Sequence, residues 1–228
     1  MKKFIVLLLI LIPVAVWGFG KGVGGKGIAA KNAGGGPTSI FSDNFDGYST
    51  GELAGNGGWT EEADYTNTFM VSIAQSQSGA NSFFVDNSAA GGSAYFYKAF
   101  TPETDDVTVD MYVYVTATEG ARILLSSNSG VETSKQAVLL ETFTDNDWQY
   151  YDGAWHTITS SDWSEGWNHI KIIASSADDN WDFYISDMET PTETSLSFRN
   201  TVTEISALAF FCSGSGSDMY IDNISVTK

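Results

Sequence analysis

The chain has 228 residues, enough for one large domain with a sizeable core behind a leader segment. All 28 acidic residues lie at or after Asp43, whereas five of the 11 basic residues precede it, and the formal net charge is −17. A body this acidic excludes binding of nucleic acid or anionic membrane through bulk charge, and it favours cation binding and solubility in salt.

The first 37 residues predict export. Two lysines follow Met1, and an apolar run extends from Phe4 to Trp17, as in a secretory signal peptide that spans residues 1–20 and is cleaved after Gly18 or Gly20. Residues 21–37 are rich in glycine with spaced lysines and predict a flexible linker. We therefore expect a secreted or cell-surface protein with no membrane span after cleavage, the alternative being a leader retained as an anchor.

Residues 38–228 predict one all-β domain. Short segments with a two-residue apolar period alternate with clusters of Gly, Asn, Asp and Ser, and they amount to about fourteen strands. The clearest strand, 107–116, turns valines and a methionine to one face and Tyr112 and Tyr114 to the other. So many strands in one domain predict a two-sheet antiparallel jelly-roll sandwich.

A hairpin is predicted at Asp152-Gly153, a sequence typical of two-residue turns. Such a turn pairs Tyr150 with Trp155 and Trp148 with Thr157, and so places Trp148, Tyr150 and Trp155 on one face. A second hairpin joins segments 167–174 and 181–186 through a polar loop.

Two acids stand where strands are expected to bury apolar side chains. Asp222 lies in the last strand, 219–226, and Asp43 in the first, 40–46. Two buried carboxylates repel unless a cation lies between them. We therefore expect the first and last strands to lie side by side and to bind a structural Ca²⁺ through Asp43, Asp46 and Asp222, because hard oxygen ligands select calcium. The alternative is that these acids accept loop N–H groups without a metal.

Several motifs resemble those of a known family. The run Gly166-Trp167-Asn168-His169-Ile170-Lys171-Ile172 and the following Trp181-Asp182-Phe183-Tyr184-Ile185 resemble the signature hairpin of laminin G-like domains of the concanavalin A-like lectin and glucanase fold. The closing strand Tyr220-Ile221-Asp222-Asn223-Ile224 is similar to theirs, whereas the end of the hairpin, Tyr184-Ile185-Ser186-Asp187, lacks the family's glycine. The resemblance implies the fold and a structural role for His169, and it leaves function open, because this fold hosts lectins, adhesion modules, hydrolases and lyases.

The expected function is carbohydrate binding or adhesion without catalysis, the partner being a polysaccharide or glycoconjugate. Aromatic faces stack on sugar rings while neighbouring polar groups bind the hydroxyls. One candidate platform consists of Trp148, Tyr150 and Trp155, and a second of Tyr112 and Tyr114 beside Asp110. For each platform the alternative is ordinary packing or a solvated sheet face.

Two other functions stay open. A glycoside hydrolase of this fold needs two carboxylates on one strand, and its spacing of Glu, any residue, Asp, two residues and Glu is absent. A polysaccharide lyase would need His156 or His169 to meet Arg122 or Arg199 and an exposed tyrosine. A purely structural surface protein would show no exposed aromatic row.

Overall fold

The computed structural model describes residues 36–62, 68–86, 95–116, 120–128, 132–143, 146–158, 163–212 and 218–228. The predicted signal peptide and almost all of the predicted linker lie outside these ranges. Gly36–Lys228 forms one compact unit.

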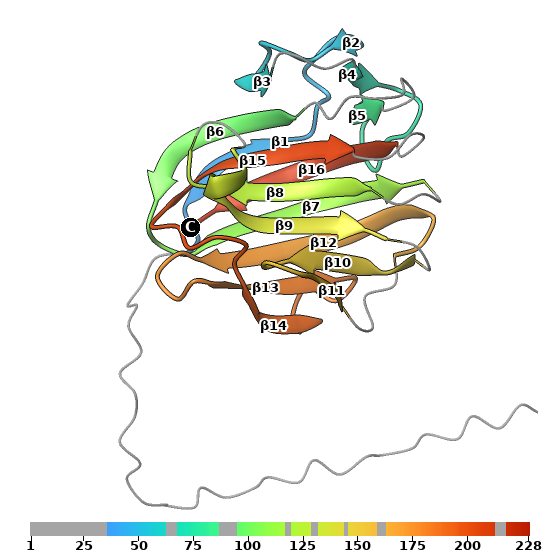
Figure 1. Ribbon diagram of the computed structural model, residues 1–228. Helices are drawn as coiled ribbons and strands as arrows, with labels where there is room; N and C mark the ends of the chain where they lie inside the picture. Colours follow the sequence, from blue (N-terminus) through green and yellow to red (C-terminus); the bar gives the residue numbers. More distant parts are fainter. Residues whose placement is uncertain are drawn as a thin grey trace, which may run out of the picture. The chain divides into compact units, whose positions relative to one another are not determined.

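The described residues form two antiparallel sheets. The nine-stranded sheet, here called sheet A, has the order β14 (Glu193–Ser197), β13 (Asn180–Ile185), β12 (Gly166–Ser175), β7 (Val107–Val115), β16 (Met219–Thr227), β5 (Ser82–Asp86), β4 (Thr68–Ser72) and β2 (Gly51–Glu52), with β1 (Ser39–Asp43) paired to β16. The seven-stranded sheet, here called sheet B, has the order β11 (Trp155–Ile158), β10 (Trp148–Tyr151), β9 (Gln136–Thr142), β8 (Ala121–Ser126), β15 (Ile205–Cys212), β6 (Phe96–Glu103) and β3 (Trp59–Glu61). A short 3₁₀ helix, η1 (Thr133–Lys135), precedes β9. Sheet B faces the viewer in Figure 1.

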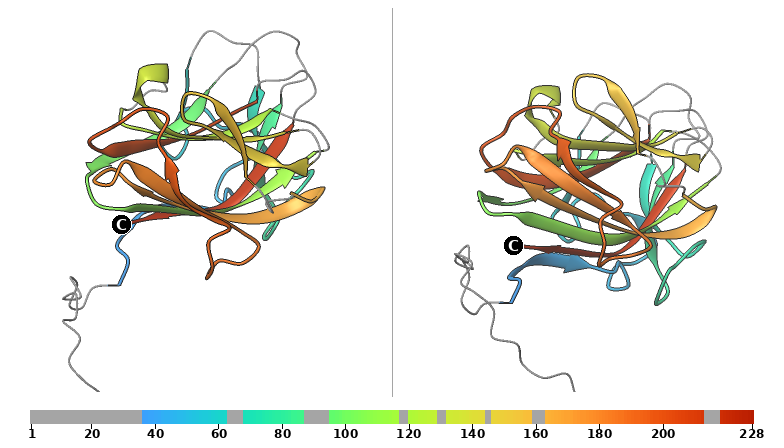
Figure 2. Two further views of the ribbon diagram at one scale, coloured as in Figure 1. Left: turned by 60° about the horizontal axis from the view of Figure 1, so that its bottom comes forward. Right: turned by 90° about the horizontal axis from the view of Figure 1, so that it is seen from below.

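The two sheets form the layers of a sandwich, seen on edge in Figure 2. Strand β7 shows why they pack: its residues alternate between buried and half-buried along its whole length, so its valines and Met111 face the other layer. Rings of Trp59, Phe83 and Phe96 stack at one end of this core, with centroids 4.7–5.9 Å apart. The predicted two-sheet jelly-roll fold is confirmed.

The strands found by periodicity are all present, and the structure adds β2 and β3. These two are too short to show a period, because each has three residues or fewer. Among the described residues, no helix is both long and apolar enough to cross a bilayer.

Strands β1 and β16 pair antiparallel, as predicted, with Asp43 opposite Ile224. The two-residue period of the last strand predicts that Tyr220, Asp222, Ile224 and Val226 share one face, and this prediction is wrong. The register shifts between Asp222 and Ser225, where Asn223 has a φ of 52°. This bulge returns Ile224 to the core and leaves Tyr220 on the outer face of sheet A.

The hairpin of β10 and β11 exists, but its predicted register is wrong by one residue. Tyr151 pairs with Trp155 and Trp148 with Ile158, so the loop holds three residues, 152–154. Gly153 there has a φ of 122°, which favours glycine. Because one step along a strand reverses the face, Trp155 lies on the opposite side of the hairpin from Trp148.

Candidate functional site

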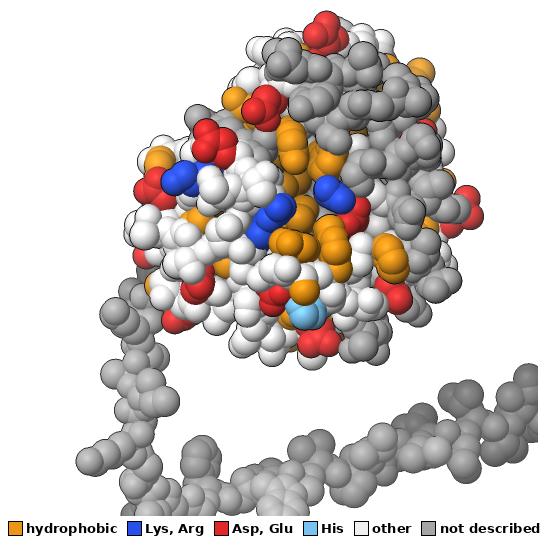
Figure 3. Space-filling model, in the orientation of Figure 1, with side chains coloured by type: hydrophobic (Ala, Val, Ile, Leu, Met, Phe, Trp, Pro, Cys, Tyr) orange, Lys and Arg blue, Asp and Glu red, His pale blue; other side chains and the backbone are white. Residues whose placement is uncertain are grey.

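The outer face of sheet B brings together residues from six separate segments of the chain. We call it the arginine face and define it by Tyr95, Arg122, Glu141, Tyr151, Arg199 and Phe211. Both arginines of the entire sequence belong to it. Figure 3 views this side of the molecule and shows basic side chains near its centre among hydrophobic ones.

Arg122 is placed by strand pairing. It lies opposite Glu141 on β9 and opposite Phe211 on β15. Its Nε is 2.9 Å from Glu141 Oε1, and its guanidinium lies over the ring of Phe211 at 4.9 Å and that of Trp155 at 5.5 Å. Gln149 donates a hydrogen bond of 3.3 Å to Glu141 Oε2. The charge of Arg122 is thus neutralised and its side chain is held against two aromatic rings.

Arg199 reaches the same face from a different layer. It follows β14 of sheet A, and its backbone N–H donates to the carbonyl of Ala137 at the start of β9. Nη1 donates to Gln136 Oε1 at 2.5 Å, and the guanidinium lies 4.9 Å from the centre of the Tyr151 ring. Burial lowers the pKa of Arg199, the nearby Tyr151 and Tyr95 oppose that shift, and the charge of Arg122 adds to it. The two guanidiniums are therefore close enough to repel.

The rest of the face is aromatic and aliphatic. Leu124, Leu139, Ala209 and Phe211 form a small apolar cluster outside the main core, against which Tyr95, Tyr97 and Tyr151 pack. The Tyr95 and Phe211 rings lie 4.6 Å apart, and the Tyr151 ring meets that of Trp155 at 5.2 Å. Trp155 is 41% exposed. Exposed aromatic surface beside polar side chains can bind a ring-shaped ligand by stacking and hydrogen bonding.

The first predicted platform is divided by the register of its hairpin. Trp148 is fully buried in the core beside Phe183, so it offers no surface to a ligand. Tyr150 is half-buried and stacks on His156, whose Nε2 is 2.8 Å from Asp152 Oδ1. Of the three predicted residues, Trp155 lies on the arginine face.

The second predicted platform lies on the outer face of sheet A, as expected. Tyr112 stacks on His169 at 4.3 Å, and His169 Nε2 is 2.8 Å from Asp110 Oδ1. Tyr114 meets Trp167 and Tyr220 edge to face. These rings already cover part of one another, so a sugar would compete with His169 for one face of Tyr112. Each histidine thus contacts a tyrosine ring and an aspartate, and not Arg122 or Arg199 as the lyase alternative requires.

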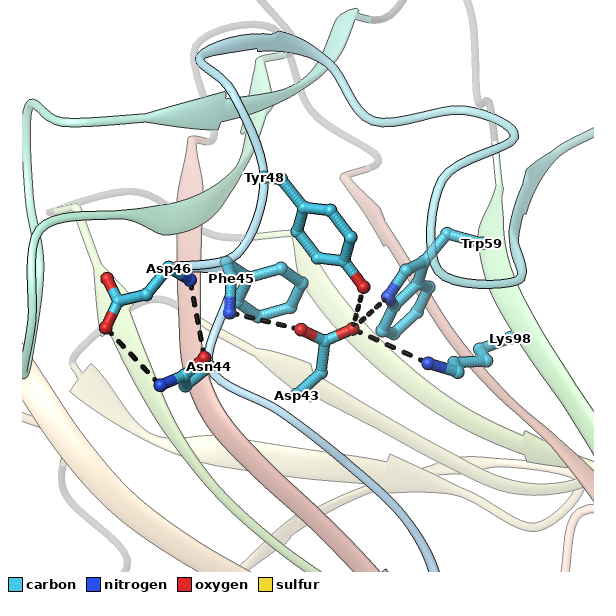
Figure 4. Close-up of polar contacts among 7 residues, drawn as sticks. All are labelled: Asp43, Asn44, Phe45, Asp46, Tyr48, Trp59 and Lys98. Atoms are coloured by element: carbon cyan, nitrogen blue, oxygen red, sulfur yellow. Dashed lines mark hydrogen bonds and ion pairs between the residues drawn. The ribbon is translucent and has the colours of Figure 1, made fainter.

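Asp43 lies in a site of its own, drawn in Figure 4. Its Oδ2 accepts hydrogen bonds from Trp59 Nε1 at 2.8 Å and from the Tyr48 hydroxyl at 2.9 Å, and lies 3.5 Å from Lys98 Nζ. Oδ1 accepts from the backbone N–H of Phe45 at 3.1 Å. Donors and a lysine thus surround this carboxylate, an environment that does not fit a metal ion.

Asp46 and Asp222 instead both accept hydrogen bonds from the loop that precedes β5. Asp222 is fully buried; its Oδ2 accepts from the backbone N–H groups of Gln77 and Ser78, and its Oδ1 from that of Asn223. Burial raises the pKa of Asp222, these N–H groups oppose that shift, and the charge of Asp46 adds to it.

Asp46 itself is exposed. Its Oδ1 accepts from the backbone N–H groups of Ala80 and Asn81, and these bonds lower its pKa. Figure 4 shows its side chain pointing away from Asp43.

A pocket of about 540 Å³ opens where β1 ends, beside the bulge in the middle of β16 and away from the arginine face. Tyr48 is the one aromatic residue in its lining, so it offers little surface for stacking. Within the described part of the chain, no group of three or more His, Cys, Asp or Glu side chains could hold a metal ion.

The arginine face was missed by sequence reasoning. The alternation in β8 does predict that Arg122 points away from the core, and the sequence holds no third arginine. Nothing in the sequence, however, indicates that Arg199 crosses to β9 or that β8, β9 and β15 are neighbours.

Comparison with solved structures places the fold among β-sandwich proteins. A sialidase superposes with a TM-score of 0.64 at 12% identity over 83% of this chain, which spans 18% of that protein. The cellulose-induced protein Cip1 gives 0.57 at 15% identity, covering 82% of this chain and 96% of that one. An endo-β-1,4-glucuronan lyase from Trichoderma reesei gives 0.54 at 9% identity, covering 84% and 96%.

No protein-family model matches the sequence, and no curated protein matches it either. At these identities the structural likeness shows the fold alone. The chain therefore has the jelly-roll sandwich fold found in proteins named as sialidase, glucanase and glucuronan lyase, whereas the laminin G-like relationship stays a prediction.

Proposed function

We propose that the protein binds carbohydrate on the arginine face, without catalysis, as an exported module. The observation that carries this proposal is the placement of two arginines, Tyr151 and exposed Trp155 on the outer face of one sheet. Aromatic rings supply stacking, and the guanidiniums supply hydrogen bonds to ligand oxygens. The names of the structurally similar proteins and the leader pattern of residues 1–20 support a carbohydrate partner met outside the cell.

The experiment compares the two sheets. Binding of the full chain to a panel of polysaccharides is measured by affinity electrophoresis and titration calorimetry, for the wild type, Trp155→Ala and Tyr114→Ala. Loss of one stacking contact of about 0.5–1.5 kcal/mol weakens binding about 2- to 13-fold, so Trp155→Ala is expected to bind that much more weakly. Tyr114→Ala is the matched control on sheet A. A loss confined to Tyr114→Ala would instead assign binding to the second platform.

A lyase is the second candidate, favoured by Tyr95 and Tyr151 on the same face as the arginines. In such a reaction an arginine neutralises the sugar carboxylate, a base removes the C5 proton, the C4–O bond breaks and the leaving oxygen takes up a proton. This elimination consumes no water, oxidant or other reactant. Neither His156 nor His169 contacts this face, so a tyrosine would act as base. Ultraviolet absorbance of the unsaturated product distinguishes this activity from binding.

Ca²⁺ is proposed as a structural ligand of Asp46 and Asp222 rather than of Asp43. One loop donates N–H groups to both carboxylates, and two amide oxygens occur at the same loop: Asn223 Oδ1 accepts from Ser78 Oγ, and Gln77 Oε1 accepts from Asn223 Nδ2. These are the hard oxygen ligands that calcium prefers. A bound cation would offset the charge of buried Asp222 and fasten the last strand to the loop.

A further inference from the structure

Arg199 has an unusual electrostatic position. The chain carries 28 acidic residues, yet among the described residues no carboxylate lies within ion-pair distance of this guanidinium. Arg122, 77 positions earlier in the sequence, does have such a partner in Glu141. The two arginines thus differ in having a carboxylate partner, although both lie on the same face of sheet B.

The charge of Arg199 is costly where it lies. Its side chain is partly buried, burial lowers its pKa, and the neighbouring Arg122 lowers it further. A partly desolvated cation is stabilised when an anion contacts it, because the attraction is stronger where water is excluded. In this structure the compensation comes from Gln136 Oε1 and the Tyr151 ring, which are neutral groups.

The guanidinium is also oriented for a ligand. A backbone hydrogen bond to Ala137 fixes the main chain, and Gln136 and the Tyr151 ring fix the planar group. Gln136 accepts from one of the five N–H donors of Arg199. Among the described residues, no second protein acceptor binds this guanidinium. A planar fork with free N–H groups matches a carboxylate, to which it can donate two parallel hydrogen bonds.

From this arrangement we propose that the arginine face selects acidic sugars, and that Arg199 binds the carboxylate of a uronic acid residue. The proposal rests on the proposed carbohydrate-binding function and adds the charge of the ligand. Tyr151, beneath the guanidinium, and Trp155, against Tyr151, supply the stacking surface beside the carboxylate. The Arg122–Glu141 pair is internally neutral and binds hydroxyls.

Overall charge opposes a long polyanion. The body of the protein is strongly acidic, so repulsion beyond the contact region disfavours an extended acidic polymer. A short oligogalacturonate is therefore the suitable probe. Its methyl ester has the same rings without the charges, and a sulfated galactan oligosaccharide of similar length distinguishes a general anion preference from a carboxylate preference.

The test is calorimetric titration of the full chain with these three probes, for the wild type, Arg199→Gln, Arg199→Lys and Lys171→Gln. Lys171 lies on sheet A over the Tyr184 ring, so its replacement removes one positive charge at a distant place. A charge-assisted hydrogen-bond contact of about 1.5–3 kcal/mol corresponds to about 10- to 150-fold in affinity. We expect the wild type to prefer the acid over the ester by that factor, and Arg199→Gln to abolish the preference by weakening binding of the acid much more than binding of the ester.

The remaining outcomes separate the two proposals. Arg199→Lys keeps the charge without the fork and is expected to bind the acid with intermediate affinity. Equal binding of acid and ester by the wild type would overturn the selectivity and leave carbohydrate binding intact. Stronger binding of the sulfated probe would overturn the assignment to a carboxylate. Absence of binding to these probes and to the whole polysaccharide panel would remove both proposals. Thermal unfolding of each variant verifies the fold.

Discussion

The hydroxyl of Tyr48 provides a defined test of the Asp43 site. Tyr48→Phe keeps the ring, which packs 6.3 Å from that of Phe45, and removes the 2.9 Å hydrogen bond to Asp43 Oδ2. A hydrogen bond to a charged group contributes about 1.5–3 kcal/mol, and partial exposure of Tyr48 brings the expected loss to about 1–1.5 kcal/mol. Urea unfolding of the full chain at neutral pH measures this loss.

The same hydroxyl predicts an alkaline transition. Burial, followed by the hydrogen bond and the charge of Asp43, raises the pKa of Tyr48 to about 12 from 10.0. Because the folded pKa lies above the unfolded one, the contribution is fully present below pH 10 and is lost as the pH rises toward about 12. The wild type should therefore lose stability in this window by more than Tyr48→Phe does.

Tyr112→Phe is the matched control, because the described contacts of Tyr112 involve its ring and not its hydroxyl. It should unfold as the wild type does. In a double-mutant cycle with Asp43→Asn, the Tyr48→Phe substitution should cost less than it does alone. A Tyr48→Phe variant as stable as the wild type, or equally sensitive to alkali, would refute the view that this hydrogen bond stabilises the fold.

Three further predictions concern stability. Ca²⁺ should raise the thermal midpoint of the full chain relative to chelator, by about 2.7 kcal/mol of unfolding free energy at one hundred times its dissociation constant, and the rise should disappear in Asp222→Asn but persist in Asp43→Asn. Gly79→Ala should destabilise the loop, measured by urea unfolding, because Gly79 has a φ of 67° and an added Cβ would collide with the Asp46 carboxylate. Phe83→Ala should lower the unfolding free energy by about 3–5 kcal/mol in the same assay, since Phe83 is fully buried among stacked rings; a loss below about 1 kcal/mol would contradict that packing.

Much of the fold could be predicted from the sequence because strand formation depends on local alternation. The two-residue period of β7 and the turn residues between segments are sufficient to identify strands and a sandwich. The adjacency of β1 and β16 followed from two acids in apolar surroundings, and it is confirmed. The face of Asp222 could not be predicted in this way, because one bulge at Asn223 reverses the alternation.

The candidate site depended on tertiary structure. The predicted hairpin register was wrong by one residue, because the turn geometry sets the register. Since each step along a strand reverses the face, the actual register places Trp148 and Trp155 on opposite faces. Arg122 and Arg199 meet because β8 and β9 are neighbours and because the chain crosses from sheet A to sheet B after β14. The sequence by itself therefore determined the strands, the sandwich and the acidic character of the protein. Only the packing of strands distant in sequence decided which side chains share a surface.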